Sequence, residues 1–164
     1  NYTSLVLFIT LVIILIISYY IFRSPVVLLK SAKIVSSSEH GITDIKVKLH
    51  IKNRSGRTIR NIKLIDKYPK LMILEDETSL GSLKPTKLLS GDKTHNLLTW
   101  NLEVLDPYEE RLIVYKLKSE LNIVGNISLP ASKIKFHTAS GERSYMSNKV
   151  KLLHKSHSAL TEKR

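Results

Sequence analysis

The chain has 164 residues, a formal net charge of +12 and no cysteine. The lack of cysteine excludes a disulfide-stapled scaffold, a zinc–thiolate site and a thiol nucleophile. Lys and Arg number 26 against 14 Asp and Glu, a balance compatible with nucleic acid, anionic lipid or an acidic protein as partner. Because most lysines alternate with apolar residues along predicted strands, we interpret the charge as a solvated basic surface and expect no nucleic-acid partner.

Residues 5–22 form an apolar segment, LVLFITLVIILIISYYIF, without a charge, a glycine or a proline. A helix of this length spans ~27 Å, close to the hydrocarbon thickness of a bilayer. In lipid, a single segment must satisfy its own backbone hydrogen bonds, and a helix does so. Pro25 ends the helix, so we predict a hydrophobic helix over residues 1–24, as a membrane anchor or filament core. A signal peptide is disfavoured, since the apolar run is long and no small-residue cleavage pattern follows it.

The N-terminus carries a second signal, because the chain begins with Asn1 and no Lys or Arg precedes the apolar segment. Taken literally, Arg23, Lys30 and Lys33 after the helix place the folded domain in the cytoplasm. Together with the missing methionine, the pattern indicates a short basic leader cleaved before Asn1, unless the chain begins inside a longer protein. Type IV prepilins and archaellins are processed in this way, and the layout resembles a mature archaeal type IV pilin or archaellin. Leu5 stands where many bacterial pilins carry Glu, which archaeal pilins often lack.

About 140 residues follow the helix, enough for one domain with its own core. The clearest alternation lies in residues 44–52, where apolar residues alternate with Lys and His as in a half-buried antiparallel strand. The predicted strands cover residues 26–34, 44–52, 58–66, 71–74, 97–104, 111–118, 133–137 and 143–153, with a short edge strand within 75–96. Turn signals lie at residues 36–41, 53–57, 106–110 and 139–142. The pattern predicts a mainly β fold, an antiparallel β-sandwich over residues 25–153 followed by a polar basic tail over 154–164.

Three segments, residues 53–69, 98–118 and 129–152, resemble the conserved-repeat, immunoglobulin-like domain of archaeal surface and membrane proteins. Its pattern has an Asn turn, an Asp and a Pro closing the next strand, a Trp strand, a Pro-acidic turn, a strand ending in an aromatic residue, and a late Ser-Asn. The matching positions are Asn53, Asp66, Pro69, Trp100, Pro107, Glu109, Tyr115, Ser147 and Asn148. The resemblance implies an immunoglobulin-like sandwich, an archaeal source, an exterior location and a structural role without a catalytic site.

The residues that could carry chemistry form no recognised motif. The histidines lack metal-ligand spacing, and no GxSxG, Walker or GxGxxG pattern occurs. Glu109 and Glu110 lie in a predicted turn and are expected to be solvated, while Trp100 is expected to anchor the core. We therefore expect no enzymatic activity, no cofactor and no metal.

Sequons begin at Asn1, Asn53 and Asn126. Asn53 and Asn126 lie at predicted turns and are candidate glycosylation sites if the domain is outside the cell. Unmodified asparagines in turns are the alternative. Asn1 lies at the helix end and is a poor acceptor.

The first functional hypothesis is a non-enzymatic structural subunit of an archaeal cell-surface filament related to type IV pili. Copies of the chain would bundle their helices into a core, with the β-sandwiches as an outer shell and membrane lipid around the helix before assembly. A helix that is apolar on all faces fits such a bundle, although the lack of Gly and Ala argues against tight small-residue packing. The helix residues expected to carry assembly are Leu5, Leu7, Ile9, Val12, Ile14 and Ile17.

The second hypothesis is a single-pass, membrane-anchored envelope or appendage accessory protein. Its immunoglobulin-like domain would lie outside the cell and contact an S-layer or another envelope protein. In both cases the expected location is the cell surface, as an extracellular filament or as an anchored protein. An enzyme or a nucleic-acid binder on a β-scaffold is supported by the charge alone.

Overall fold

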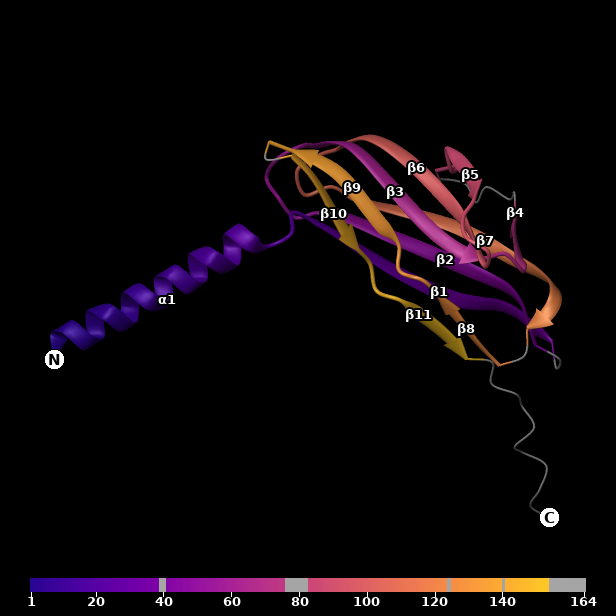
Figure 1. Ribbon diagram of the computed structural model, residues 1–164, viewed down its shortest axis with the longest axis horizontal. Helices are drawn as coiled ribbons and strands as arrows, with labels where there is room; N and C mark the ends of the chain where they lie inside the picture. Colours follow the sequence, from indigo (N-terminus) through magenta and orange to yellow (C-terminus); the bar gives the residue numbers. More distant parts are fainter. Residues whose placement is uncertain (39–40, 76–82, 124, 140, 154–164) are drawn as a thin grey trace, which may run out of the picture.

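The computed structural model describes residues 1–38, 41–75, 83–123, 125–139 and 141–153. Helix α1 (Tyr2–Phe22) projects from one end of a β-sandwich, as Figure 1 shows. The Thr10 hydroxyl donates to the Val6 carbonyl at 2.9 Å, so this polar group is satisfied by the helix backbone itself. The helix ends at Phe22, and the next residue, Arg23, has an extended backbone at ψ 131°, two residues before Pro25.

The described strands pair in two large sheets and one ribbon, with antiparallel neighbours throughout. The first sheet has the order β1-β2-β7-β4, the second β10-β9-β3-β6-β5, and β8 pairs with β11. The strands are β1 (Val26–Ser38), β2 (Gly41–Asn53), β3 (Ile59–Pro69), β4 (Met72–Glu75), β5 (Lys87–Ser90), β6 (His95–Leu105), β7 (Glu110–Ile123), β8 (Asn126–Leu129), β9 (Lys133–Thr138), β10 (Gly141–Met146) and β11 (Val150–Leu153). This architecture confirms the predicted N-terminal helix followed by an antiparallel β-sandwich.

Alternation along the strands builds the core between the sheets. On β2, the apolar residues are fully buried, and they are Ile42, Ile45, Val47, Leu49 and Ile51. Trp100 on β6 is 1% exposed, and its ring centroid lies 5.8 Å from that of Tyr115 on β7. The Trp100 indole N–H donates to the Leu83 carbonyl at 3.0 Å. Trp100 is therefore a core residue with a satisfied polar end, as predicted.

The single last strand predicted over residues 143–153 is wrong. The segment divides into β10 and β11, which belong to different sheets (Figure 1). Ser147 and Asn148 lie between them, and the Ser147 N–H donates to the Ser132 carbonyl at 2.8 Å instead of continuing a ladder. Apolar alternation alone does not reveal this change of sheet, because residues on both sides of the break remain β-prone.

Two smaller predictions also differ from the structure. Strand β1 continues through Ser36 to Ser38, where a turn was expected, and register shifts around Ser36 accommodate the pairing with β2. Strand β8 lies outside all the predicted strands, and it pairs with β11 in a separate two-stranded ribbon. The expected tail at 154–164 lies outside the described residues.

Candidate functional site

Helix α1 exposes apolar side chains on every face. The six predicted assembly residues are all exposed: Leu5 56%, Leu7 67%, Ile9 48%, Val12 37%, Ile14 54% and Ile17 52%. Among the residues that the structure describes, α1 is the single helix long and apolar enough to cross a membrane, by length and composition. An apolar surface of this extent needs lipid or protein around it. That these six side chains carry assembly stays a prediction.

A short connection joins the helix to the sandwich. The Pro25 carbonyl accepts a hydrogen bond from the Arg54 N–H at 2.7 Å, and the Ser24 hydroxyl donates to the Val26 carbonyl. The Tyr108 N–H donates to the Ser55 carbonyl at 3.3 Å. We call Pro25, residues 53–57 and residues 106–109 the helix-proximal end. It carries exposed basic and aromatic side chains, namely Arg54, Arg57 and Tyr108.

Asn53 organises the helix-proximal end. Its Nδ2 donates to the Arg57 and Asp106 carbonyls at 2.8 and 2.9 Å, and its Oδ1 accepts from the Ser55 N–H and hydroxyl at 2.9 and 2.8 Å. Asn53 is 0% exposed. A glycan on Nδ2 would displace these bonds, so the folded domain leaves no room for the modification considered at this residue. Asn126 is exposed at the start of β8, and glycosylation there stays a prediction.

Glu109 completes the turn between β6 and β7, where a solvated acid was expected. Its Oε1 accepts from the Arg111 guanidinium at 2.5 Å, and its Oε2 accepts from the Asp106 N–H at 2.6 Å. These hydrogen bonds, that from Arg111 first, lower the pKa of the Glu109 carboxyl. Glu110 is exposed and bonds to His50 and Lys52 across the sheet. The two acids are structural surface groups, and each has its own cationic neighbour.

A buried ion pair links the two sheets. Lys30 of β1 places its Nζ 2.5 Å from Oδ1 of Asp66 on β3, and both side chains are 0% exposed. The ammonium also donates to the Pro130 carbonyl at 2.9 Å and to the Lys67 carbonyl at 3.4 Å. All three N–H bonds of Lys30 therefore have acceptors. Burial lowers the pKa of Lys30, against the opposing effect of the Asp66 carboxylate.

Both oxygens of the Asp66 carboxylate also accept hydrogen bonds from neighbouring residues. Oδ1 accepts from the Ser132 hydroxyl and the Lys67 N–H, each at 2.8 Å, in addition to Lys30. Oδ2 accepts from the Tyr115 hydroxyl at 2.5 Å. Burial, and then the Asp66 charge, raises the pKa of Tyr115 well above its ordinary value, so this hydroxyl remains a donor.

The Asn148 side chain forms hydrogen bonds with the backbone of Lys30 on β1. Its Oδ1 accepts from the Lys30 N–H at 3.0 Å and its Nδ2 donates to the Lys30 carbonyl at 2.8 Å, as a neighbouring strand would. The Ser147 hydroxyl accepts from the Ser132 N–H at 2.8 Å. Four positions of the family-like pattern thus converge on one network, and they are Asp66, Tyr115, Ser147 and Asn148.

Sequence reasoning missed Lys30 and Ser132. The sequence does contain a signal for the burial of Lys30. Val26, Leu28 and Lys30 are alternate residues of one strand, so their side chains lie on the same face. The apolar members of that set are buried, and Lys30 is 3% exposed. Ser132 lies in the connection between β8 and β9, where no periodicity applies. The general interpretation of lysines as solvated therefore fails at Lys30.

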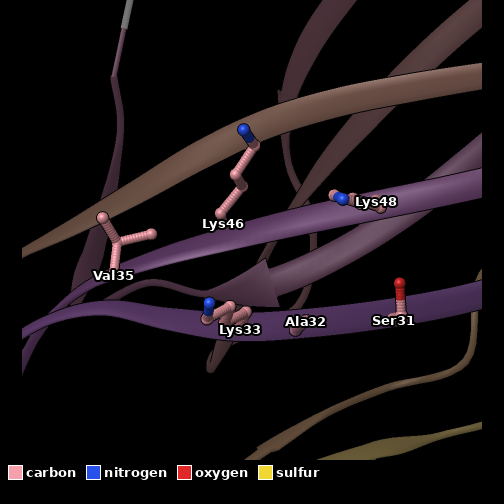
Figure 2. Close-up of a pocket in the computed structure, with 6 residues that line it drawn as sticks. All are labelled: Ser31, Ala32, Lys33, Val35, Lys46 and Lys48. Carbon is pink, nitrogen blue, oxygen red and sulfur yellow. The ribbon is translucent and has the colours of Figure 1, made fainter.

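A basic pocket lies on β1 and β2. Figure 2 shows Lys33 from β1 and Lys46 and Lys48 from β2, and the pocket is also lined by Ser31, Ala32 and Val35. Lys33 lies directly opposite Lys46 in the ladder, and like charges in that position repel. Here the lysines do form the solvated basic face that the sequence predicts. Among the described residues, no group of three His, Asp or Glu side chains could hold a metal.

No protein-family model matches the sequence, and comparison with curated proteins found no match. Domains D2 and D3 of the major pilin SpaD from Corynebacterium diphtheriae match with a TM-score of 0.52 and 11% identity, over 77% of this chain and 52% of that chain. A GH20 exo-β-N-acetylglucosaminidase from Vibrio harveyi matches with a TM-score of 0.40 and 12% identity, over 76% of this chain and 18% of that chain. The bacterial hydrophobin BslA matches with a TM-score of 0.39 and 9% identity, over 77% of this chain and 92% of that chain.

The SpaD comparison shows a shared β-sandwich fold. The chain spans about a fifth of the glucosaminidase and about half of the SpaD fragment. The chain thus combines one helix that is long and apolar enough to cross a membrane with a β-sandwich whose fold also occurs in SpaD.

Proposed function

We propose that the chain is a non-enzymatic structural subunit of an archaeal cell-surface filament related to type IV pili, in which α1 forms the core and the β-sandwich the outer shell. The observation that carries the proposal is the exposure of apolar side chains on every face of α1. Copies of the chain would cover these faces in a bundle, and lipid would cover them before assembly.

The short connection between helix and sandwich supports this arrangement. Three residues, Arg23 to Pro25, separate α1 from β1, and the Pro25 carbonyl is held by Arg54. A sandwich held this close to its helix would pack against its neighbours when the helices bundle. The fold likeness to SpaD agrees with a sandwich that serves as a filament module.

A single-pass, membrane-anchored envelope protein is the second candidate, with an S-layer or other envelope protein as partner. The exposed Arg54, Arg57 and Tyr108 at the helix-proximal end are side-chain types that lie at membrane surfaces, and they fit a helix that stays in lipid. Helix α1 also lacks Gly and Ala, the smallest of the residues that many helix pairs in membranes use at their contacts.

The test is electron microscopy of material sheared from the native cells, with Ile14→Lys compared with the matched Ile14→Leu variant. A charge in a water-free helix bundle costs about 3 kcal/mol, so Ile14→Lys is expected to abolish filaments and Ile14→Leu to keep them. Filaments of normal length from Ile14→Lys would overturn the proposal. A wild-type chain released only by detergent, as a monomer or dimer, would favour the anchored protein.

A further inference from the structure

We propose that Lys30 and Asp66 react to form an intramolecular isopeptide bond, which joins the two sheets of the sandwich covalently. The two side chains come from β1 in the first sheet and β3 in the second. Their reactive groups are in contact, with Nζ 2.5 Å from Oδ1, and both are closed off from water. An amine and a carboxyl held together in a dry site are the two reactants of amide formation.

The reaction needs no partner from outside the pair. A proton passes from the Lys30 ammonium to the Asp66 carboxylate, which gives an amine and a carboxylic acid. The Nζ lone pair then attacks Cγ of Asp66 and forms the C–N bond. The resulting tetrahedral centre loses one carboxyl oxygen with two protons, one from the acid and one from Nζ. The products are one amide and one water, so atoms and charge balance.

The surroundings of the pair favour these steps. Burial of Lys30 makes the ammonium form costly and so makes the neutral amine more accessible. The Tyr115 hydroxyl donates to Oδ2 and the Ser132 hydroxyl to Oδ1, where negative charge develops as the amine attacks. The Pro130 carbonyl accepts from Nζ at 2.9 Å and holds the nitrogen in position.

The position of the bond gives it a mechanical consequence. Strand β1 is the edge strand of its sheet and the first strand after α1, so a pull on the helix acts first on β1. Strand β3 lies inside the second sheet, between β9 and β6. A covalent link from β1 to β3 would prevent β1 from peeling away from β2. This role rests on the proposed surface function, whereas the bond itself does not.

The test is intact-mass spectrometry of the full chain purified in detergent, followed by protease digestion and tandem mass spectrometry. The expected mass is lower by one water than that calculated from the sequence, and one branched peptide is expected to contain both Lys30 and Asp66. A full, unreduced mass with the two residues in separate peptides would overturn the proposal. This measurement is independent of filament formation, so the two proposals fail separately.

Two variants sharpen the test. Lys30→Arg keeps the positive charge, but its guanidinium is too poor a nucleophile, so the full calculated mass is expected. A water-deficient mass that persists in Lys30→Arg would place the modification elsewhere and overturn the assignment. Lys33→Arg is the matched control on the exposed face of the same strand, and its mass is expected to show the same loss of water as the wild type.

Discussion

The Lys30 Nζ lies 2.5 Å from Asp66 Oδ1, and this contact ties the strand that follows the helix to the opposite sheet. Burying two charges is costly unless their hydrogen-bonding capacity is filled. Here backbone carbonyls fill it for Lys30, while Ser132 and Tyr115 fill it for Asp66. The network therefore specifies how β1 packs against the second sheet.

Replacing Lys30 with Met should destabilise the domain strongly. Met can form neither the ion pair nor the proposed amide, so the variant keeps a buried Asp66 carboxylate without a cation, and breaking a buried pair in this way costs about 3–5 kcal/mol. Chemical denaturation of wild type and variant, followed by Trp100 fluorescence, measures the difference. Lys33→Met is the matched control, because Lys33 is exposed on the same strand and its loss should change the free energy of unfolding by less than about 0.5 kcal/mol. Equal stability of Lys30→Met and wild type would contradict the structural role of the pair.

Tyr115→Phe tests the second side of the network. The variant keeps the ring against Trp100 but removes the hydroxyl that donates to Asp66 Oδ2. Hydrogen bonds to charged groups contribute about 1.5–3 kcal/mol, and we expect a loss of unfolding free energy in that range. Tyr108→Phe, at an exposed tyrosine, should have no comparable effect. If both variants unfold at the same denaturant concentration as wild type, the Tyr115 hydroxyl does not support the carboxylate.

Asn53→Ala should disrupt the helix-proximal end. It removes the donor to the Arg57 and Asp106 carbonyls and the acceptor for Ser55, and each buried polar group left without a partner costs about 1–3 kcal/mol. A lower melting temperature is expected, measured by circular dichroism. Asn126→Ala, at an exposed residue, is the control and should melt near the wild type. A glycan found on Asn53 by mass spectrometry of folded native protein would contradict this structural role.

The sequence predicts the helix and the sandwich well because both depend on patterns repeated over many residues. Alternation on β2 and the unbroken apolar run of α1 are such patterns. The buried network depends instead on contacts between residues far apart in the sequence, such as Lys30 with Asp66, 36 positions away, and with Asn148, 118 positions away. The family-like pattern contains Asp66 and Asn148 but does not state that both meet Lys30. The Asn148 contact lies at the division between β10 and β11, which periodicity cannot reveal.

Acid should weaken the turn that leads into β6. Asp92 Oδ1 accepts from the Thr94 N–H at 2.8 Å, the Thr94 hydroxyl at 2.9 Å and the His95 N–H at 2.8 Å. These bonds, those from Thr94 first, lower the pKa of Asp92 well below its ordinary value of 3.8. The carboxylate therefore stabilises the fold above the ordinary aspartate pKa, and this contribution is lost as pH falls through the lowered folded-state pKa.

NMR titration of the Asp92 carboxyl and the Thr94 amide measures that shift. The two signals should move together, with a midpoint below 3.8. In Asp92→Asn, the Thr94 amide signal should lose this titration step. A midpoint at the ordinary value would show that the turn does not hold the carboxylate as described.

Removal of residues 1–24 should give a sandwich that folds and stays in solution without detergent. The described residues of α1 include none that is buried, so the helix lends the sandwich no core contacts. The Pro25 carbonyl and the strand that follows it keep their bonds to Arg54 and β2. The shortened chain should therefore show the same β-rich circular dichroism and the same melting temperature as the full chain in detergent. An aggregated or unfolded product would mean that α1 covers part of the sandwich, and the helix could not then be an independent surface for lipid or for other copies.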